Sequence, residues 1–218
     1  MNSIVHFIKV TLTVYIFSMF LYAIWYFFQV VDLAKMNPLD EWIGSLVYLP
    51  HGARVLMFCY FRYYSLPGLY LAEISGPQLI HHIDYVDGWS LAALGSLSSV
   101  IIAVEIIRWV RKNPENFSVV KTLSFKNYKS LILVVLISAM LNGILANSLI
   151  AIVNSSISID VLTVLRFMIG DILGAIIVIG ALWVIFTTLI DTRLIICLLY
   201  TSDAADERSS VDLGGRRI

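Results

Sequence analysis

Long apolar stretches separated by short polar links constrain this chain more than any other feature. They cover Lys9 to Val31, Trp89 to Val110, Ser130 to Val153 and Val161 to Leu189. A helix needs about 20 apolar residues to cross the hydrocarbon core of a bilayer, and each stretch is that long. Because backbone polar groups must pair within the protein in lipid, the sequence predicts an all-α, polytopic bundle of transmembrane helices.

The composition agrees with a membrane chain. Of the 218 residues, 59% are hydrophobic and only 14% are charged, whereas roughly a quarter of residues are charged in soluble domains. The length suits about six helices of roughly 20 residues with short loops. The net charge of zero argues against nucleic acid as a partner, and the expected partner is the lipid bilayer. The first apolar stretch is too long for the core of a signal peptide, so we expect it to be a helix of the mature protein.

Two further apolar segments contain groups that hydrocarbon does not tolerate alone. The second predicted span runs from Trp42 to Phe61 and contains Pro50-His51-Gly52-Ala53-Arg54. The third segment opens at Leu66-Pro67-Gly68, contains Glu73 and stops at Gly76-Pro77. It is predicted to be a short span, a broken helix or a re-entrant segment. With both segments included, the bundle has about six spans, one of them short or broken.

Basic residues gather in one loop and orient the bundle. The positive-inside rule places the loop between the fourth and fifth spans in the cytoplasm, because it holds Arg111, Lys112, Lys121, Lys126 and Lys129. The predicted outer loops are instead acidic, with Asp32, Asp40, Glu41, Asp84, Asp87 and Asp160. Six crossings then place both the N-terminus and the end of the last helix in the cytoplasm. If the third segment only dips into the membrane, the first two spans instead have the opposite orientation and Arg62 lies outside.

Ionisable side chains inside the predicted spans mark a candidate site. His51 and Arg54 are three residues apart and share a helix face, Glu73 follows in the next segment, and Asp171 lies deep in the last span. Intramembrane ionisable residues are functional candidates by default. Pairing of opposite charges that only fixes helix register is an equal alternative. The predicted pocket for an unknown small ligand or ion consists of Pro50, His51, Gly52, Arg54, Glu73, Gly170, Asp171 and Gly174.

Other polar residues in the spans favour structural roles. Asn142 and Asn147 are five residues apart and are predicted to make interhelical hydrogen bonds. Glu105 and Arg108, one turn apart, are predicted to form a local ion pair.

Catalysis, metal binding and disulfides are not expected. No Ser-His-Asp order, phosphate-binding loop or HExxH motif is present, so the sequence predicts no enzyme and no cofactor. The adjacent His81 and His82 point apart and lack a third metal ligand. The two cysteines, Cys59 and Cys197, lie in apolar surroundings and predict neither a disulfide framework nor a zinc site.

The polar C-terminal segment, residues 197–218, differs abruptly from what precedes it. It resembles the translation of a transposase sequencing adapter, with one match over Cys197 to Glu207 and a second, in the same frame, over Ser210 to Ile218. The expectation is therefore an integral membrane domain over 1–196, followed by a non-native polar tail. A genuine disordered polar tail is the alternative.

Three patches together resemble the membrane-associated sensor domains of bacteria, the first of the MASE families. They are Pro50-His51-Gly52-Ala53-Arg54, Leu66-Pro67-Gly68 through Glu73, and Leu165-Arg166-Phe167-Met168-Ile169-Gly170-Asp171-Ile172-Leu173-Gly174. The resemblance implies a multi-pass protein of the bacterial inner membrane. It also implies a sensory domain that passes an undefined signal to a cytoplasmic histidine kinase or diguanylate cyclase domain, which this sequence lacks.

These observations lead to one main hypothesis and two alternatives. The main hypothesis is that the chain is an input domain of a bacterial signalling protein, in which a small ligand or ion binds the polar pocket and moves the last helix. The alternatives are the substrate-binding membrane subunit of a vitamin importer and a structural membrane protein without a ligand. A second copy of the chain is a further candidate partner.

Overall fold

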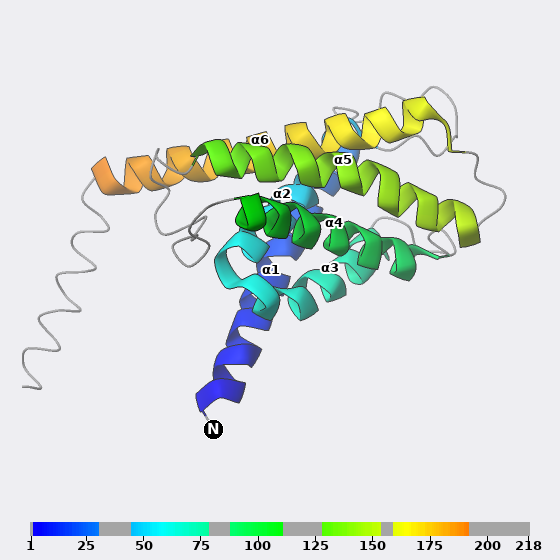
Figure 1. The fold of residues 1–218 in the computed structure, drawn as a ribbon. Coiled ribbons are helices and arrows are strands. Elements are labelled where there is room, and N and C mark those ends of the chain that lie inside the picture. Colours follow the sequence, from blue (N-terminus) through cyan, green and yellow to red (C-terminus); the bar gives the residue numbers. More distant parts are fainter. Residues whose placement is uncertain (1, 31–44, 79–87, 111–127, 154–158, 192–218) are drawn as a thin grey trace, which may run out of the picture. The chain divides into compact units, whose positions relative to one another are not determined.

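A computed structural model describes residues 2–30, 45–78, 88–110, 128–153 and 159–191 (Figure 1). In those ranges all regular structure is helical, which confirms the all-α prediction. Residues 1–179 form one compact unit, and residues 180–218 form a second unit. The helices are α1 (Asn2–Val30), α2 (Leu49–Phe61), the 3₁₀ helix η1 (Arg62–Ser65), α3 (Leu66–Gln78), α4 (Trp89–Val110), α5 (Tyr128–Val153) and α6 (Val161–Asp191).

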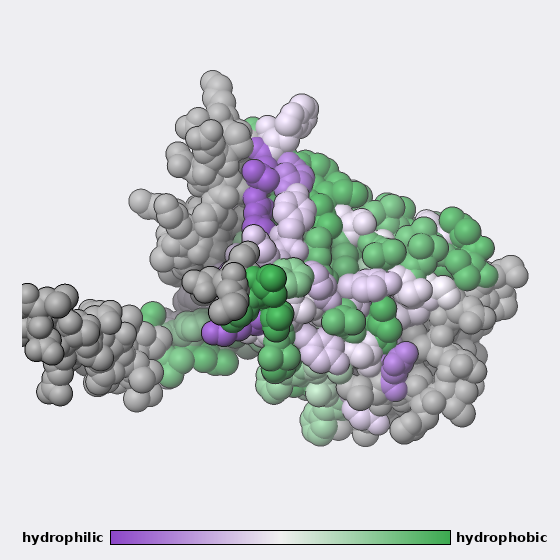
Figure 2. Space-filling view, turned by 90° about the horizontal axis from the view of Figure 1, so that it is seen from below, coloured by the Kyte–Doolittle hydropathy of each residue, from purple (hydrophilic) through white to green (hydrophobic). Residues whose placement is uncertain are grey.

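Four helices are long and apolar enough to cross a membrane: Ile4–Phe28, Trp89–Val110, Tyr128–Val153 and Val161–Asp191. Large hydrophobic side chains are exposed along them, and Figure 2 shows hydrophobic residues spread over the visible face. The expectation of about six spans is not confirmed. Helices α2 and α3 have 13 residues each, so each is about 20 Å long, against about 30 Å of hydrocarbon.

Helices α2 and α3 form a helical hairpin that packs along α1. Near the C-terminal end of α1, the hydroxyl of Tyr22 lies 2.7 Å from that of Tyr48, which comes just before α2. Near the N-terminal end of α1, the ring centroid of His6 lies 6.1 Å from that of Tyr64, which follows α2. Gly76, near the end of α3, lies again at the level of Tyr22, because a Cβ there would meet the tyrosine ring. Helix α2 therefore runs antiparallel to α1, and α3 returns parallel to it.

The chain reverses between α2 and α3 over very few residues. Arg62 adopts a positive φ of 55° with ψ −138°, a backbone conformation that a helix cannot continue through, and its N–H donates to the Phe58 carbonyl. The Ser65 hydroxyl then donates to the Arg62 carbonyl at 2.6 Å. The other end of α2 is set by Pro50, whose missing N–H costs nothing in a first helical turn. Pro50 thus fits a helix that begins at Leu49. Trp42, where the second span was predicted to begin, lies outside the described residues.

Helices α4 and α5 pack as an antiparallel pair and lie side by side in Figure 1. Gly95 of α4 faces Ala146 and Leu149 of α5, and a Cβ at Gly95 would lie 2.7 Å from the Leu149 side chain. Small residues here allow the two helices to approach closely. The pair joins α1, α2 and α3 around a buried apolar core that includes Val14, Val55, Phe58, Leu69, Val100, Val104 and Val134.

The extended segment before α2 lies against two glycines of α6. The Tyr48 N–H donates to the Gly170 carbonyl at 2.9 Å. A Cβ on Gly170 would collide with the Ser45 carbonyl oxygen, and one on Gly174 with the Tyr48 carbonyl oxygen. The backbone at Ser45 and Tyr48 can lie directly against α6 only because the two residues of α6 that it contacts are glycines.

The start of α6 is capped by Asp160. Its Oδ1 accepts hydrogen bonds from the Thr163 N–H and the Thr163 hydroxyl, both at 2.7 Å. These two bonds lower the pKa of the Asp160 carboxyl below its ordinary value. A capping carboxylate at this end also complements the helix dipole, and it fixes where α6 begins.

Gly174 and Gly180 provide a matched test of the backbone contact, because both lie in α6. Gly174→Ala should lower the free energy of unfolding by about 1–3 kcal/mol, since the new methyl group meets the Tyr48 carbonyl. A Cβ on Gly180 would have no atom within 4 Å among the described residues, so Gly180→Ala should leave the free energy unchanged or raise it by up to about 1 kcal/mol. Unfolding in mixed micelles with increasing SDS measures both. Equal effects of the two substitutions would contradict the packing.

Candidate functional site

The structure brings together the four ionisable side chains predicted from the spans. His51 and Arg54 come from α2, Glu73 from α3 and Asp171 from α6, and none is more than 2% exposed. Tyr22 of α1 and Ser138 and Asn142 of α5 complete the group, and they too are buried. We call these seven residues the polar cluster. It lies where five helices meet in a part of the fold that is otherwise apolar.

One half of the polar cluster neutralises Arg54. Its Nε lies 2.8 Å from Glu73 Oε1, an ion pair whose geometry is not that of an aligned hydrogen bond. The guanidinium also lies 5.2 Å from the centroid of the Tyr48 ring, within the range of a cation–π contact. The Tyr48 hydroxyl in turn contacts the hydroxyl of Tyr22. The Glu73 carboxylate and the face of the Tyr48 ring, which is itself held by the Tyr22 hydroxyl, together allow the Arg54 guanidinium to remain inside the bundle.

The other half is a chain of contacts through His51. His51 Nε2 lies 3.0 Å from the Ser138 hydroxyl, and His51 Nδ1 lies 3.5 Å from Asp171 Oδ2. Asn142 Nδ2 donates to the same carboxylate oxygen at 2.6 Å. Asp171 is therefore held from two helices, by an amide of α5 and by an imidazole of α2.

Several buried polar atoms of the polar cluster have no hydrogen-bond partner among the described residues. They are His51 Nδ1, Arg54 Nε and Nη1, Glu73 Oε2 and Asn142 Oδ1. An unpaired buried donor or acceptor costs about 1–3 kcal/mol, and native proteins carry few of them. Two of these atoms, His51 Nδ1 and Arg54 Nε, still lie at ion-pair distance from a carboxylate, so the open hydrogen-bonding capacity is on Arg54 Nη1, Glu73 Oε2 and Asn142 Oδ1.

Ser138, His51 and Asp171 make contacts in the order that serine hydrolases use, which the sequence did not predict. Such triads are defined by geometry and not by chain order, so no motif reveals them. Here the Ser138 side chain is fully buried, and its hydroxyl donates to the Val135 carbonyl of its own helix at 3.2 Å. A nucleophile needs access to its substrate, and this serine has none. The arrangement suits proton sharing better than acyl transfer.

The remaining predicted pocket residues have positions that explain the packing. Gly52 faces Val178 of α6, where a Cβ would lie 2.8 Å from the valine side chain. Gly170 and Gly174 flank Asp171 and accept the backbone at Ser45 and Tyr48 as described above, while Pro50 starts α2. The three glycines and the proline thus bring α2 and α6 close enough for His51 to reach Asp171. Their contact with a ligand stays a prediction.

The structure also places the polar residues for which structural roles were predicted. Glu105 and Arg108 form the predicted ion pair, with Nη1 3.0 Å from the carboxylate. Asn142 makes the predicted interhelical hydrogen bond, to Asp171. The prediction for Asn147 is wrong for its amide nitrogen, because Asn147 Nδ2 donates to the Gly143 carbonyl one turn earlier in the same helix. His81, His82 and Cys197 lie outside the described residues.

Tyr22, Tyr48 and Ser138 were missed by sequence reasoning. Tyrosines near the ends of spans indicate a membrane interface, and a serine among small residues indicates close helix packing. Neither pattern tells a pocket residue from an ordinary one. The missing information was the pairing of helices, which places Tyr22 beside Tyr48 and Ser138 beside His51.

Comparison with known protein families, curated proteins and solved structures gave no match to this chain.

The Arg54–Glu73 pair predicts strong coupling between the two residues. Arg54→Met alone leaves a buried carboxylate, and Glu73→Gln alone leaves a buried guanidinium, so each should lower the free energy of unfolding by about 3–5 kcal/mol. The double variant should recover a large part of that loss, because it buries neither charge. A double-mutant cycle in SDS unfolding measures the coupling.

The exposed pair of α4 is the control for this cycle. Glu105 and Arg108 are each about one-third exposed, so Glu105→Gln and Arg108→Met should each change stability by less than about 1 kcal/mol. Additive losses at Arg54 and Glu73 would show that the two side chains do not depend on each other.

Proposed function

We propose that this chain is the membrane input domain of a bacterial signalling protein. A small ligand or ion binds the polar cluster, and the effect passes to a cytoplasmic histidine kinase or diguanylate cyclase domain. The observation that carries the proposal is the set of buried atoms on His51, Arg54, Glu73 and Asn142 that make no hydrogen bond among the described residues. A ligand with complementary donors and acceptors would satisfy those atoms, and their desolvation has already occurred in the fold.

The position of the polar cluster suits a relay. Asp171 is on α6, whereas its neighbours His51 and Asn142 are on α2 and α5. A ligand that strengthens or replaces these contacts binds two packings of α6 unequally, and only unequal binding shifts an equilibrium. Helix α6 is 31 residues long and continuous from the cluster to Asp191, so a shift at Asp171 would move its far end as well.

We further propose that the α2–α3 hairpin reaches from the outer side of the membrane to its cytoplasmic face. The hairpin contacts α4 at two levels. The Trp89 ring N–H donates to the Glu73 carbonyl at 2.7 Å, and the Tyr63 hydroxyl donates to Glu105 at 3.1 Å. These two residues of α4 are 16 positions apart in the sequence, which corresponds to about 24 Å along the helix.

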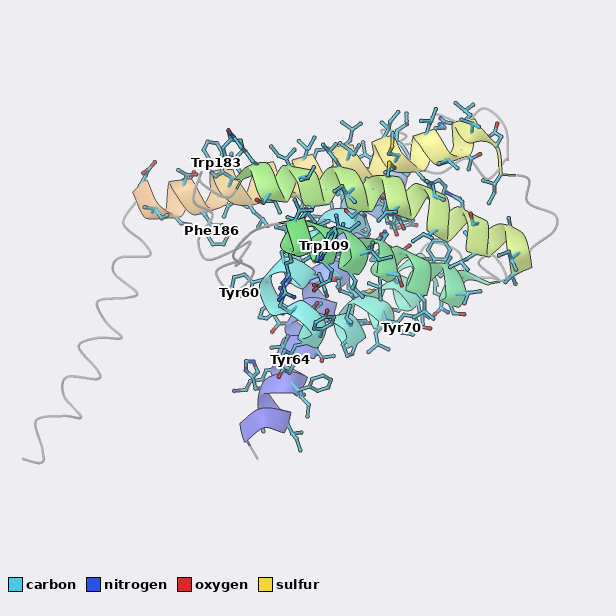
Figure 3. All side chains as sticks on the ribbon, viewed as in Figure 1. Tyr60, Tyr64, Tyr70, Trp109, Trp183 and Phe186 are labelled. Carbon is cyan, nitrogen blue, oxygen red and sulfur yellow. The ribbon has the colours of Figure 1, made fainter. Side chains whose placement is uncertain are left out.

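Aromatic residues at the turn of the hairpin support an interfacial position. Tyr60, Tyr64 and Trp109 are all more than half exposed, and Figure 3 shows them projecting from the ends of α2, η1 and α4. Exposed tyrosine and tryptophan side chains gather at membrane interfaces, where ring and polar tip both find a suitable environment. The end of α4 leads into the basic loop at Arg111, so this interface would be the cytoplasmic one of a bacterial inner membrane, with the N-terminus on the same side.

Cysteine labelling from the two sides of the membrane tests this orientation. In a background without the native cysteines, Tyr64→Cys and Lys121→Cys should react with a membrane-impermeant maleimide from the cytoplasmic side, and Asp84→Cys from the outer side. Both ends of the hairpin lie on the outer side of the membrane whether its turn crosses to the cytoplasmic interface or stays within the bilayer, so labelling at Tyr64 tests the crossing separately from the orientation. An unreactive Tyr64→Cys would therefore reject the crossing, and labelling of Asp84→Cys and Lys121→Cys from the same side would reject the orientation.

The input-domain proposal is tested at the natural gene and then at Asp171. The reading frame beyond Ile196 should encode a kinase or cyclase domain. In that full-length protein, Asp171→Asn should change the output activity at least about tenfold, the size of a 1.4 kcal/mol bias between two packings, while the protein still accumulates in the membrane. Glu105→Gln, an exposed carboxylate on another helix, is the matched control and should leave the output unchanged.

Two results would reject the proposal. An immediate stop codon after the last helix would favour the transport or structural alternatives. Loss of membrane accumulation in Asp171→Asn, together with normal output in the more conservative Asp171→Glu, would show that the carboxylate only joins helices.

A further inference from the structure

The polar cluster contains one more carboxylate than it has cations. The Arg54 guanidinium stays protonated at every physiological pH and pairs with Glu73 at 2.8 Å. For Asp171, His51 is the one basic side chain within ion-pair distance in the described ranges of the chain. A buried carboxylate without its own counter-charge is destabilised by several kcal/mol, and the only charge that Arg54 offers Asp171 is the longer-range field of a guanidinium already paired with Glu73.

The hydrogen atoms around His51 point to the same deficit. The Ser138 hydroxyl donates to the Val135 carbonyl, so it accepts from His51 Nε2–H. A neutral His51 then presents the lone pair of Nδ1 to Asp171 Oδ2 at 3.5 Å, and two acceptors face each other. If the serine instead donates to Nε2, His51 carries its hydrogen on Nδ1, but the negative charge of Asp171 still has no cation.

We propose that the polar cluster binds one proton, shared between His51 Nδ1 and Asp171 Oδ2. The proton comes from water and forms an N–H or O–H bond, and no other bond changes. When it is present, the contact is either an imidazolium with a carboxylate or a carboxylic acid with a neutral imidazole. Both arrangements satisfy Nδ1, which has no hydrogen-bond partner in the described structure.

Few competing charges face this pair from the helices packed around it. Helix α5 contributes only the uncharged Asn142 and Ser138, and α4 contributes the Trp89 ring N–H, which binds the Glu73 backbone. The titratable or charged groups that face the pair from the other described elements are Tyr22 of α1, Tyr48 before α2, Arg54 of α2 and Glu73 of α3. Glu73 is engaged with Arg54, so Asp171, whose Oδ2 accepts only the neutral Asn142 amide in the described part of the chain, is the carboxylate in the cluster without an arginine at ion-pair distance.

The proton site follows from the geometry of the polar cluster, whereas its role in signalling rests on the proposed function. In that role, the proton is the ion that biases the packing of α6. Loss of the proton would leave the Asp171 carboxylate and the lone pair of His51 Nδ1 facing each other. Helix α6 would then move away from α2 and α5, so the proton would link external pH to helix packing.

Infrared and NMR spectra of the intact chain in lipid nanodiscs test the proton directly. At about pH 7, close to the ordinary range of histidine titration, one of two signatures is expected. Either a buried carboxylic-acid C=O band is lost in Asp171→Asn, or the ¹⁵N spectrum shows an imidazolium that is lost in His51→Gln. Glu105→Gln, which removes a carboxylate outside the polar cluster, is the control and should retain the signature.

The outcomes separate the two proposals. An ionised Asp171 beside a neutral His51 in the wild-type chain overturns the proton site, and this result needs no variant. If Asp171→Asn does not fold, Asp171→Glu should shift the carboxylic-acid band, and an unshifted band also overturns the site. A missing proton in a protein whose output still responds at Asp171 would leave the input domain standing. A bound proton in a chain whose gene encodes no output domain would leave only the proton site.

Discussion

The ion pair between Arg54 and Glu73 is the interaction on which the inner structure depends. Helices α2 and α3 have 13 residues each and are shorter than ordinary membrane spans. Their place in the bundle requires that the guanidinium of one and the carboxylate of the other compensate each other, because either charge alone would favour water over the helix interior. The pair therefore joins the two arms of the hairpin at the level where the rest of the polar cluster gathers.

Close backbone approach is the second requirement. Gly170 and Gly174 lie on either side of Asp171, and they allow the extended segment at Ser45 and Tyr48 to touch α6. This contact brings the first turn of α2 within reach of Asp171 and so sets the distance to His51. The same glycines that predicted a ligand pocket thus act through packing, and the cluster forms because two backbones come closer than side chains would permit.

The sequence predicted the long helices well because length and apolarity alone define them. The span expected from Trp89 to Val110 has those bounds in the structure, and the last one starts at Val161 as expected. The short helices were harder. The third segment was predicted to stop at Gly76-Pro77, and α3 is described to Gln78, within the one or two residues by which helix ends vary. The contact of Gly76 with the Tyr22 ring was not predictable, because no local pattern contains it.

The candidate site shows the same division between local and long-range information. Charged residues in apolar stretches identify themselves, so His51, Arg54, Glu73 and Asp171 were predicted without knowledge of helix pairing. Which of them would pair was not predictable, since Arg54 had two possible carboxylates, and the geometry gives it Glu73.

That choice decides the chemistry. Arg54 paired with Asp171 would have left Glu73 beside Tyr22, whose hydroxyl can donate to it, and the polar cluster would have had no orphan carboxylate next to an imidazole. With Arg54 paired to Glu73, the second carboxylate of the cluster is Asp171, and its Oδ2 lies 3.5 Å from the imidazole Nδ1 of His51. The assignment of a single ion pair therefore determines where a proton or a ligand can act.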